Sequence, residues 1–403
     1  MQPSVCTIVL NYNAPLETML KCLESLRAQT YDNHRVILVD NGSSVDILDE
    51  VAAAHPDVEI VTLDRNYGFS GGINRGVAKA AGADYVYLLN FDTVVEPGCV
   101  SEMVAVAEGD PGIVGVAPKI LLADLPQIFD SVGTALGDNA GAFNQGIGQP
   151  DVGQYDMSER VFGACFGAAL IRRRAFEPGN VGPLDESYFM YFEDFDWCFR
   201  ANLMGEKFFT APAAVVHHEH SASVKDKNYS FKFKLIELNL LRTVVKDYQR
   251  RQAVEIPLLR LRTHLRHATS RRSGSALVSA RIIFEFLIDL PRLLPKRWEI
   301  QKRRRVRDLD ILKYSYGEVP YFNPSGYSPE YTLDTLSTAY RRLYTVTGEE
   351  EALGVWKGLD ALNKSKLRFD RAVLTRRLGQ LLVGQPKHVL DFAAKIKAVD
   401  GDG

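Results

Sequence analysis

The sequence has no uninterrupted apolar run long enough to cross a bilayer, which takes roughly 20 residues in a helix. We therefore expect no membrane-spanning segment. The start of the chain also lacks the basic and apolar pattern of a secretion signal. Its first apolar stretch, residues 5–10, is short and runs directly into Asn11. This predicts a strand followed by a turn, in a protein that is not secreted.

Paired cysteines and an excess of one charge are also missing. The five cysteines are scattered, odd in number and without a C-x-x-C pair, which argues against a disulfide framework and a zinc site. This usage predicts a reducing cytoplasm. The formal net charge is −2, from 48 basic and 50 acidic residues, so nothing in the composition indicates a nucleic-acid partner.

The first half alternates β-branched runs with helical patterns, which is typical of βαβ units and predicts an α/β fold with a mainly parallel sheet. Apolar residues at helical spacing predict helices over residues 16–26 and 73–81. A long loop or hairpin is expected over residues 133–156. Strands are predicted over residues 6–10, 35–39, 59–63, 85–89, 112–117, 161–171 and 207–216.

Polar residues follow three of these strands directly, namely Asn11, Asp40 and Asn90. The carboxyl ends of strands in such sheets form the ligand crevice, so these side chains are candidates for ligand contact. In residues 40–43 a carboxylate and an amide can hydrogen-bond a nucleotide base and ribose. The same residues are equally typical of a turn with a helix N-cap, so this alternative stays open.

The segment from Asn66 to Gly76 is rich in glycine. Gly68, Gly71 and Gly72 allow the backbone to approach a ligand closely, and the helix that follows favours an anion such as a pyrophosphate at its N-terminus. The spacing is not that of the dinucleotide fingerprint. We expect this segment to contact the ligand.

Asp92 lies just after the apolar fourth strand. A hard divalent cation that bridges a pyrophosphate takes carboxylate oxygen and needs few protein ligands, so Asp92 is a candidate metal ligand, with an Asp-Thr turn as the alternative. His217 and His218 end the last predicted strand. Successive strand residues point to opposite faces, so at most one of them can face the site, and either can be an ordinary surface or core histidine.

Residues 188–197 place three carboxylates among aromatic side chains. Burial of a charge costs several kcal/mol unless something compensates it, so carboxylates kept in such surroundings are candidates for catalysis. Glu193 and Asp194 lie at the start of a predicted helix. Acidic residues there also suit the helix dipole, and helix capping is therefore the alternative interpretation.

These motifs, in their order along the chain, resemble glycosyltransferase family 2 and within it the bacterial rhamnosyltransferases. The resemblance covers residues 4–223. It is carried by residues 7–13 (TIVLNYN), 39–43 (VDNGS), 66–72 (NYGFSGG), 90–93 (NFDT) and 192–196 (FEDFD).

The resemblance implies a GT-A fold with a Rossmann-like sheet, a nucleotide-sugar donor, Mg²⁺ or Mn²⁺, and inversion at the anomeric carbon. The family's D-x-D motif is reduced here to residues 90–92. By position, Asp194 would be the general base, supported by Glu193, and Asp92 would bind the metal. One of His217 and His218 falls where relatives place a metal or diphosphate ligand. The donor would be contacted by Asn11, Asp40, Asn66, Gly68, Gly71, Gly72 and Asn90.

The sequence changes character near residue 226. Residues 1–224 are expected to form the catalytic domain, residues 225–313 a basic amphipathic helical region and residues 314–403 a helical extension of unknown role. In the middle region an apolar stripe that includes Phe286 and Leu293 and a run of arginines up to Arg305 predict docking on an anionic membrane surface. Packing of this helix on the catalytic domain is the alternative, which Glu285 and Asp289 favour.

The predicted function is an inverting glycosyltransferase on the inner face of the plasma membrane. It would move rhamnose from dTDP-rhamnose to a hydroxyl of a cell-surface glycan or a lipid-linked saccharide. A donor such as UDP-hexose or UDP-galactofuranose, and a non-catalytic glycan-binding scaffold, are the alternatives. A nucleotidyltransferase would need a glycine-rich and basic triphosphate loop after the first strand, which residues 11–14 lack.

Overall fold

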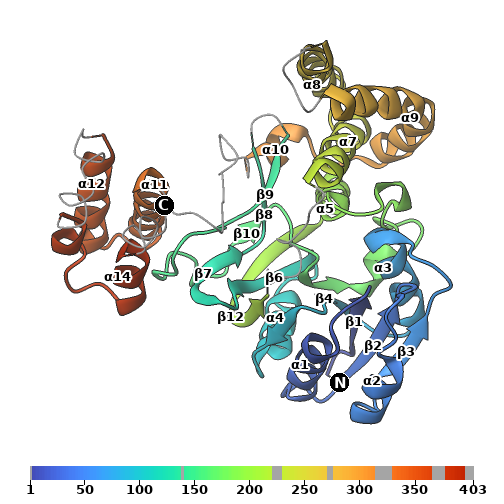
Figure 1. Ribbon diagram of the computed structural model, residues 1–403, viewed down its shortest axis with the longest axis horizontal. Helices are drawn as coiled ribbons and strands as arrows, with labels where there is room; N and C mark the ends of the chain where they lie inside the picture. Colours follow the sequence, from blue (N-terminus) through green and yellow to red (C-terminus); the bar gives the residue numbers. More distant parts are fainter. Residues whose placement is uncertain are drawn as a thin grey trace.

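The structure is a computed structural model that describes residues 2–137, 140–219, 229–269, 276–313, 329–364 and 377–394. An α/β unit is followed by long helices that pack on it and by a separate group of C-terminal helices (Figure 1). The strands of the main sheet are β1 (Val5–Asn11), β2 (His34–Asp40), β3 (Glu59–Thr62), β4 (Tyr85–Asn90), β5 (Thr93–Val95), β6 (Ile113–Leu122), β7 (Leu125–Ser131), β10 (Arg160–Val161), β11 (Ala168–Arg172) and β12 (Lys207–His218).

One half of the main sheet is parallel. β1 pairs in parallel with β2 and with β4, and β2 pairs in parallel with β3. In the other half β11 runs antiparallel between β4 and β6, while β12 is parallel to β6. The strand order is β10-β12-β6-β11-β4-β1-β2-β3. The α/β class with a mainly parallel sheet is therefore confirmed.

Helices cover both faces of this sheet. α1 (Leu16–Arg27), α2 (Leu48–Ala54) and α4 (Cys99–Glu108) pack on one face, and α3 (Gly68–Lys79) and α5 (Glu193–Leu203) pack on the other. Successive side chains of β1 point to opposite faces, so Ile8 belongs to the core with α3 and α5 and Val9 to the core with α1 and α4.

The predicted elements of the first half are present, with two corrections. The helix predicted over residues 73–81 begins at Gly68, because the glycines of this segment pack tightly against neighbouring protein atoms. The strand predicted over residues 161–171 is split into β10 and β11, since residues 165–167 leave the sheet and line a cavity. The predicted hairpin contains β8 (Thr134–Leu136) and β9 (Ala142–Asn144).

The helices described after the sheet begin with α7 (Tyr229–Asp247), α8 (Gln252–Thr269), α9 (Ala276–Arg303) and α10 (Asp308–Leu312). Leu240, Val244 and Tyr248 belong to the same core as α3 and α5, so α7 packs as part of the catalytic unit. The short 3-10 helices η1 (Arg173–Phe176) and η2 (Glu186–Tyr188) precede α5. No helix in the described ranges combines the length and apolarity that a membrane span requires.

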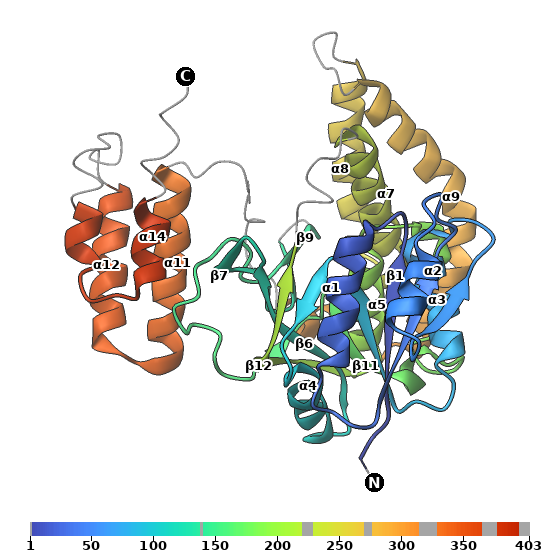
Figure 2. The ribbon, with the colours of Figure 1, turned by 60° about the horizontal axis from the view of Figure 1, so that its bottom comes forward.

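The last helices form a group of their own, as the predicted helical extension requires (Figure 2). They are α11 (Pro329–Thr347), α12 (Glu350–Lys364) and α14 (Lys387–Ala394). Their shared core reaches the sheet through Leu122 and Ile128. An ion pair between Arg342 and Glu159 also joins the two parts.

Candidate active site

A cavity of about 380 Å³ opens beside the carboxyl ends of β4 and β12 and the start of α5. Its lining includes four residues that the sequence motifs predicted from distant parts of the chain: Asn90, Glu193, Asp194 and His218. Asp130 also lines the cavity, and the sequence motifs did not predict it. The cavity therefore gathers the acidic and imidazole groups that the motifs supplied separately.

Asp92, His218 and Asp130 form a buried cluster at one side of the cavity. Nε2 of His218 lies 3.3 Å from Oδ1 of Asp92, and Nδ1 lies 2.7 Å from Oδ2 of Asp130 on β7. Burial by itself would lower the pKa of His218, but its hydrogen bonds to the two carboxylates and their charges raise that pKa to about 10. Without a bound cation, the imidazole is therefore protonated and neutralises part of the acidic charge.

His217 points away from this cluster. Its Nε2 lies 3.1 Å from Oε1 of the half-exposed Glu96. β12 pairs with β5, so that His217 and His218 lie opposite successive residues, Val94 and Thr93, and project to opposite faces. Of the two histidines, His218 is the one that lines the cavity.

Glu193 and Asp194 lie at another wall of the cavity, in the first turn of α5. Burial raises the pKa of Asp194 to about 6, although hydrogen bonds from backbone N–H groups such as that of Phe195 oppose this rise. Burial and the neighbouring charge of Asp194 raise the pKa of Glu193 well above its usual value. A carboxyl group with a pKa near 6 is suited to accept a proton close to neutral pH.

Helix capping accounts for part of the setting of Asp194, whose Oδ1 accepts from the N–H of Phe195 at 2.8 Å, but not for Glu193. The N-cap position is Phe192, which makes no side-chain capping hydrogen bond. Oε2 of Glu193 is buried and has no hydrogen-bond partner among the described residues. The third carboxylate of this segment, Asp196, instead pairs with Arg200 at 2.9 Å and Lys246 at 2.6 Å, so its role is structural.

Asn11 and Asp40 meet at the carboxyl ends of β1 and β2, where they are register neighbours. Nδ2 of Asn11 donates to Oδ1 of Asp40 at 2.8 Å, and the backbone N–H of Ser43 donates to Oδ2 at 3.3 Å. The Asp40 side chain is thus held in place on the side of the sheet where the motifs place the nucleotide. The turn interpretation is also correct for this segment, because Gly42 has a φ of +69° and a Cβ there would lie 2.4 Å from the Arg65 carbonyl carbon.

The sequence allowed the amide of Asn41 to hydrogen-bond a nucleotide, but in the structure this amide is bound by protein groups. Its Nδ2 donates to Oδ1 of Asn66 at 3.1 Å and to the carbonyl of Gly68 at 3.0 Å, and its Oδ1 accepts from the N–H of Tyr67 at 3.0 Å. The reason is that the start of α3 needs partners for its backbone groups. Asn41 therefore fixes the glycine segment to the end of β2.

Close packing explains at least two of the glycines. A Cβ at Gly68, which has a φ of +71°, would lie 2.3 Å from the carbonyl oxygen of Phe189, and a Cβ at Gly72 would lie 2.5 Å from Leu10. At Gly71 a Cβ would meet Tyr67 at 2.7 Å. The space that these glycines leave is filled by protein, so ligand contact by this segment stays a prediction that concerns its backbone N–H groups.

Residues 4–178 match the family model of glycosyl transferase family 2. This part of the chain is therefore a family 2 glycosyltransferase domain. The matched residues include β1 to β4 and Asp92 but end before Glu193 and Asp194. Glu193, Asp194 and His218 are therefore candidate site residues from the motifs and the cavity, and not from the family model.

Two relatives of this glycosyltransferase act on glycans according to their names. An N-acetylglucosaminyl-diphospho-decaprenol L-rhamnosyltransferase of Mycobacterium tuberculosis is 28% identical over 244 residues, which is 55% of this chain and 78% of the relative. An amylovoran biosynthesis glycosyltransferase of Erwinia amylovora is 26% identical over 269 residues, which is 63% of this chain and 84% of the relative.

The fold is that of a solved glycosyltransferase structure, the crystal structure of GalNAc-T7 with UDP, GalNAc and Mn²⁺. The TM-score is 0.54 at 15% sequence identity. The superposition covers 72% of this chain and 57% of the other chain. This similarity confirms the GT-A fold class.

Proposed function

We propose that this glycosyltransferase transfers rhamnose from dTDP-rhamnose, with inversion, to a hydroxyl of a cell-surface glycan or lipid-linked saccharide. The observation that carries the transfer chemistry is the cavity, in which a buried carboxylate with a raised pKa lies across from a protonated histidine between two aspartates. The rhamnose donor rests on the mycobacterial relative that is named a rhamnosyltransferase.

In the proposed reaction the acceptor hydroxyl attacks the anomeric carbon from the face opposite the diphosphate. Asp194 takes the proton of that hydroxyl as the new carbon–oxygen bond forms and the bond to the diphosphate oxygen breaks. General base assistance of this kind is worth about a hundredfold to ten-thousandfold in rate. Aromatic side chains such as Phe166, Phe192 and Phe195 line the cavity and would exclude water that could hydrolyse the donor.

Asp92 and His218 fit a divalent cation, Mg²⁺ or Mn²⁺. Oδ1 of Asp92 is buried and lies 3.3 Å from Nε2 of His218, so a carboxylate oxygen and an imidazole nitrogen, both ligand types for such cations, lie side by side. Such a cation would have to displace the proton of His218 if that ring became a ligand. When bound, it would neutralise charge that develops on the leaving diphosphate. Within the described ranges no group of three or more ligand side chains stands ready for it, so Asp92 and His218 are the residues proposed to hold it.

The nucleotide would lie along the ends of β1, β2 and β4, in contact with Asn11, Asp40, Asn66 and Asn90. The N-terminal turn of α3, which begins at Gly68, would lie near the diphosphate, while the N–H groups of Gly68 and Ser70 donate to Oδ1 of Asn66 and to the carbonyl of Phe189. These contacts are proposals for the donor-binding residues that the motifs indicate.

The test is a panel of nucleotide-sugars, with dTDP-rhamnose, UDP-glucose and UDP-galactofuranose, in a hydrolysis assay and by calorimetry. We expect binding and slow hydrolysis of dTDP-rhamnose in preference to the two UDP-sugars. Preference for a UDP-sugar would overturn the assignment of rhamnose as the donor sugar, but the assignment as a glycosyltransferase would stand. Glycan binding without turnover of any donor would support the scaffold alternative.

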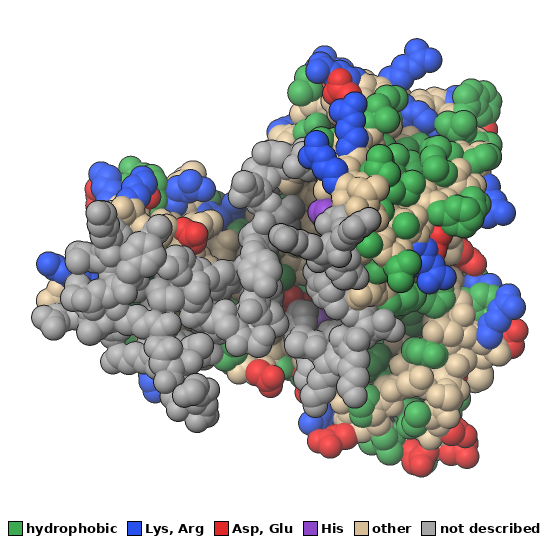
Figure 3. All heavy atoms as spheres, turned by 45° about the horizontal axis from the view of Figure 1, so that its top comes forward, with side chains coloured by type: hydrophobic (Ala, Val, Ile, Leu, Met, Phe, Trp, Pro, Cys, Tyr) green, Lys and Arg blue, Asp and Glu red, His purple; other side chains and the backbone are tan. Residues whose placement is uncertain are grey.

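We also propose that α8 and α9 dock the protein on the anionic inner face of the plasma membrane. The apolar face that the sequence predicted is in part internal, because Phe286 and Leu293 are buried against α7 and α8. Between them other apolar residues project outward, and Figure 3 shows hydrophobic side chains gathered over α8 and α9 with Lys and Arg nearby. The exposed apolar residues of α9 are Leu277, Phe284, Leu287, Ile288, Leu294 and Trp298.

Two of the arginines that the sequence assigned to membrane contact serve the fold instead. Arg303 donates to the carbonyls of Gly179 and Asn180, and Arg304 pairs with the buried Asp308 at 2.6 Å. Backbone carbonyls and a buried carboxylate in this part of the chain need these donors. Their replacement would therefore test folding and not docking.

A sharper variant of the docking surface is Phe284→Glu with Trp298→Glu, because both side chains are more than half exposed. We expect wild type to sediment with anionic vesicles at low salt and this variant to stay in solution. Val383→Glu, which changes an exposed apolar residue of the C-terminal helical group, is the matched control and should still sediment. Equal binding of wild type to neutral vesicles, or none to anionic ones, would overturn the docking proposal.

A further inference from the structure

The loop that leads into the catalytic carboxylates has a strained backbone. Phe189 has a φ of +63° and a ψ of −64°, and the N–H of Met190 donates to the carbonyl of Tyr188 at 2.8 Å. This is the classic γ-turn, which is rare and strained. Tyr191 and Phe192 follow with φ values of +66° and +76°, which non-glycine residues seldom adopt. Such a conformation persists only where its surroundings hold it.

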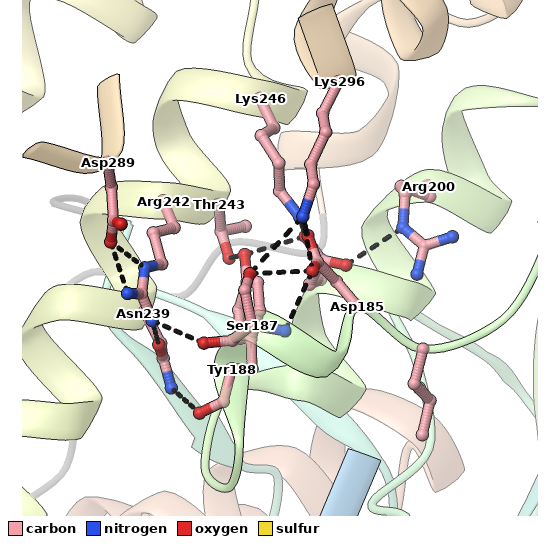
Figure 4. A network of polar contacts seen from close by, with 12 residues as sticks. Asp185, Ser187, Tyr188, Arg200, Asn239, Arg242, Thr243, Lys246, Asp289 and Lys296 are labelled. Carbon is pink, nitrogen blue, oxygen red and sulfur yellow. Dashed lines mark hydrogen bonds and ion pairs between the residues drawn. The ribbon is translucent and has the colours of Figure 1, made fainter. Parts of the chain in front are cut away.

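The side chain of Asn239 on α7 contacts three carbonyls of this loop. Nδ2 of the fully buried Asn239 lies 3.1 Å from the carbonyl oxygens of Tyr188 and Met190 and 2.7 Å from that of Tyr191. The carbonyl of Tyr188 also accepts the γ-turn hydrogen bond from Met190, and all three carbonyls lie within hydrogen-bond reach of the Asn239 amide. Figure 4 shows Asn239 between α7 and the loop.

The orientation of the Asn239 amide is itself fixed. Nη1 of Arg242 donates to Oδ1 of Asn239 at 2.8 Å and also to the carbonyl of Ser187 at 2.8 Å (Figure 4). Arg242 is held in turn by an ion pair with Asp289 of α9. With its oxygen engaged by a cation, the amide can only present its N–H groups to the loop.

Other residues on the same side of α7 also face the loop. Thr243, four residues after Asn239, lies with its hydroxyl 2.6 Å from the hydroxyl of Tyr188. Lys246, seven residues after Asn239, pairs with Asp185 at 2.8 Å, just before the loop. Positions three, four and seven apart share one face of a helix, so a whole face of α7 is committed to residues 185–191.

The loop touches both halves of the proposed active site. The carbonyl of Phe189 accepts a hydrogen bond from the N–H of Ser70 at 3.3 Å and fills the space left by Gly68, at the start of the donor-side helix α3. At its other end, Phe192 is the N-cap residue of α5, whose first two residues are Glu193 and Asp194. A shift of the loop would therefore change the distance between the donor and the base.

We propose that Asn239 is a positioning residue that sets the place of Asp194 relative to the donor by holding the strained loop. This inference rests on the proposed transfer reaction. It assigns to α7, which lies outside the matched family residues, a specific task in catalysis. Because the chemical step depends on this geometry more steeply than donor binding does, loss of Asn239 should lower kcat rather than raise KM for the donor.

The experiment compares full-length wild type with Asn239→Ala, using the nucleotide-sugar of the panel that wild type turns over fastest. We expect kcat to fall about tenfold to a hundredfold and donor KM to stay within about threefold. Asn239→Gln, which keeps the N–H donors, should recover part of kcat. If wild type turns over no nucleotide-sugar, the proposed function fails; if wild type is active and Asn239→Ala keeps its kcat, only the positioning inference fails.

A matched control separates positioning from general loosening of the helices. Glu285→Gln weakens the ion pair between Lys234 of α7 and Glu285 of α9, whose atoms lie 2.9 Å apart. This ion pair joins the same two helices without involving residues 185–191. We expect this control to keep wild-type kcat, and an equal loss of kcat in the control would overturn the proposal. Where Asn239→Ala does not fold, Thr243→Val removes only the hydroxyl beside Tyr188, and it should lower kcat severalfold without a change in KM. A Thr243→Val variant with wild-type kcat would then count against the proposal.

Discussion

The two carboxylate clusters of the cavity differ in how their charge is balanced. Asp92 and Asp130 flank His218, which their charges keep protonated. Glu193 and Asp194, at the other wall, have no cationic partner within the described ranges, and burial raises the pKa of both carboxyl groups. The difference indicates a division of labour, in which the cluster of Asp92 is proposed to hold a cation, whereas Asp194, with its raised pKa, can exchange a proton near neutral pH.

A third cluster, next to the second, shows that burial alone does not decide this. Asp196 lies two residues after Asp194 and is fully buried, yet the charges of Lys246 and Arg200 outweigh its burial and lower its pKa. The side chain of Asp196 faces α7 instead of the cavity. Three neighbouring carboxylates thus acquire different chemistry from their partners and not from their own type.

Replacement of Asp194 should have the largest effect on turnover. Asp194→Asn removes the basicity with little change of shape, so we expect turnover to fall about a hundredfold or more with donor binding retained. Turnover and donor affinity are measured by transfer assay and calorimetry. Near-normal transfer would remove Asp194 as the base and direct attention to Glu193.

The balanced cluster should respond in binding rather than in proton transfer. Asp92→Ala removes the carboxylate oxygen proposed for the cation, and we expect the gain in donor affinity on addition of Mn²⁺, about tenfold or more, to be lost. Calorimetry with and without Mn²⁺ measures this effect. Since His217 points away from the cavity, His217→Ala is the control and should keep the response to Mn²⁺. If the response survives in Asp92→Ala, a cation is held elsewhere.

The pH dependence of kcat/KM should also distinguish the two clusters, with a smaller effect. Asp194 acts as a base only when ionised, so kcat/KM should fall with decreasing pH below its raised pKa of about 6, approaching tenfold per pH unit. The protonated His218 should not titrate over this range, because its own pKa is raised to about 10. An acidic limb near pH 4 would mean that the base is a carboxylate in ordinary solvent surroundings.

The meeting of polar residues at the strand ends was predictable from local sequence. Asn11, Asp40 and Asn90 each end a strand of the parallel half of the sheet, and parallel strands bring their carboxyl ends to one edge. The acidic pair at the start of α5 was found because carboxylates among aromatic side chains are costly to bury. Each of these features consists of residues that are adjacent in sequence, so a local pattern was enough to predict it.

The sequence could not find Asp130 or Asn239. Asp130 lies in a short strand of unremarkable composition, and its importance comes only from the 2.7 Å contact with His218, 88 residues away. Asn239 lies among apolar residues of a helix and gives no signal except as one polar residue in an apolar stripe. Both are defined by a partner that is distant in sequence, and no local pattern encodes such a partner.

By itself, the sequence determined the α/β class, the strand ends that carry polar residues and the helical nature of the last part of the chain, because periodicity and strand-end chemistry are local properties. Tertiary structure alone decided which histidine lines the cavity, which arginines serve the fold, and which carboxylate has a raised pKa. Each of these depends on burial and on charges brought in by distant elements. The protonation state of a side chain is a property of its surroundings, and folding creates those surroundings.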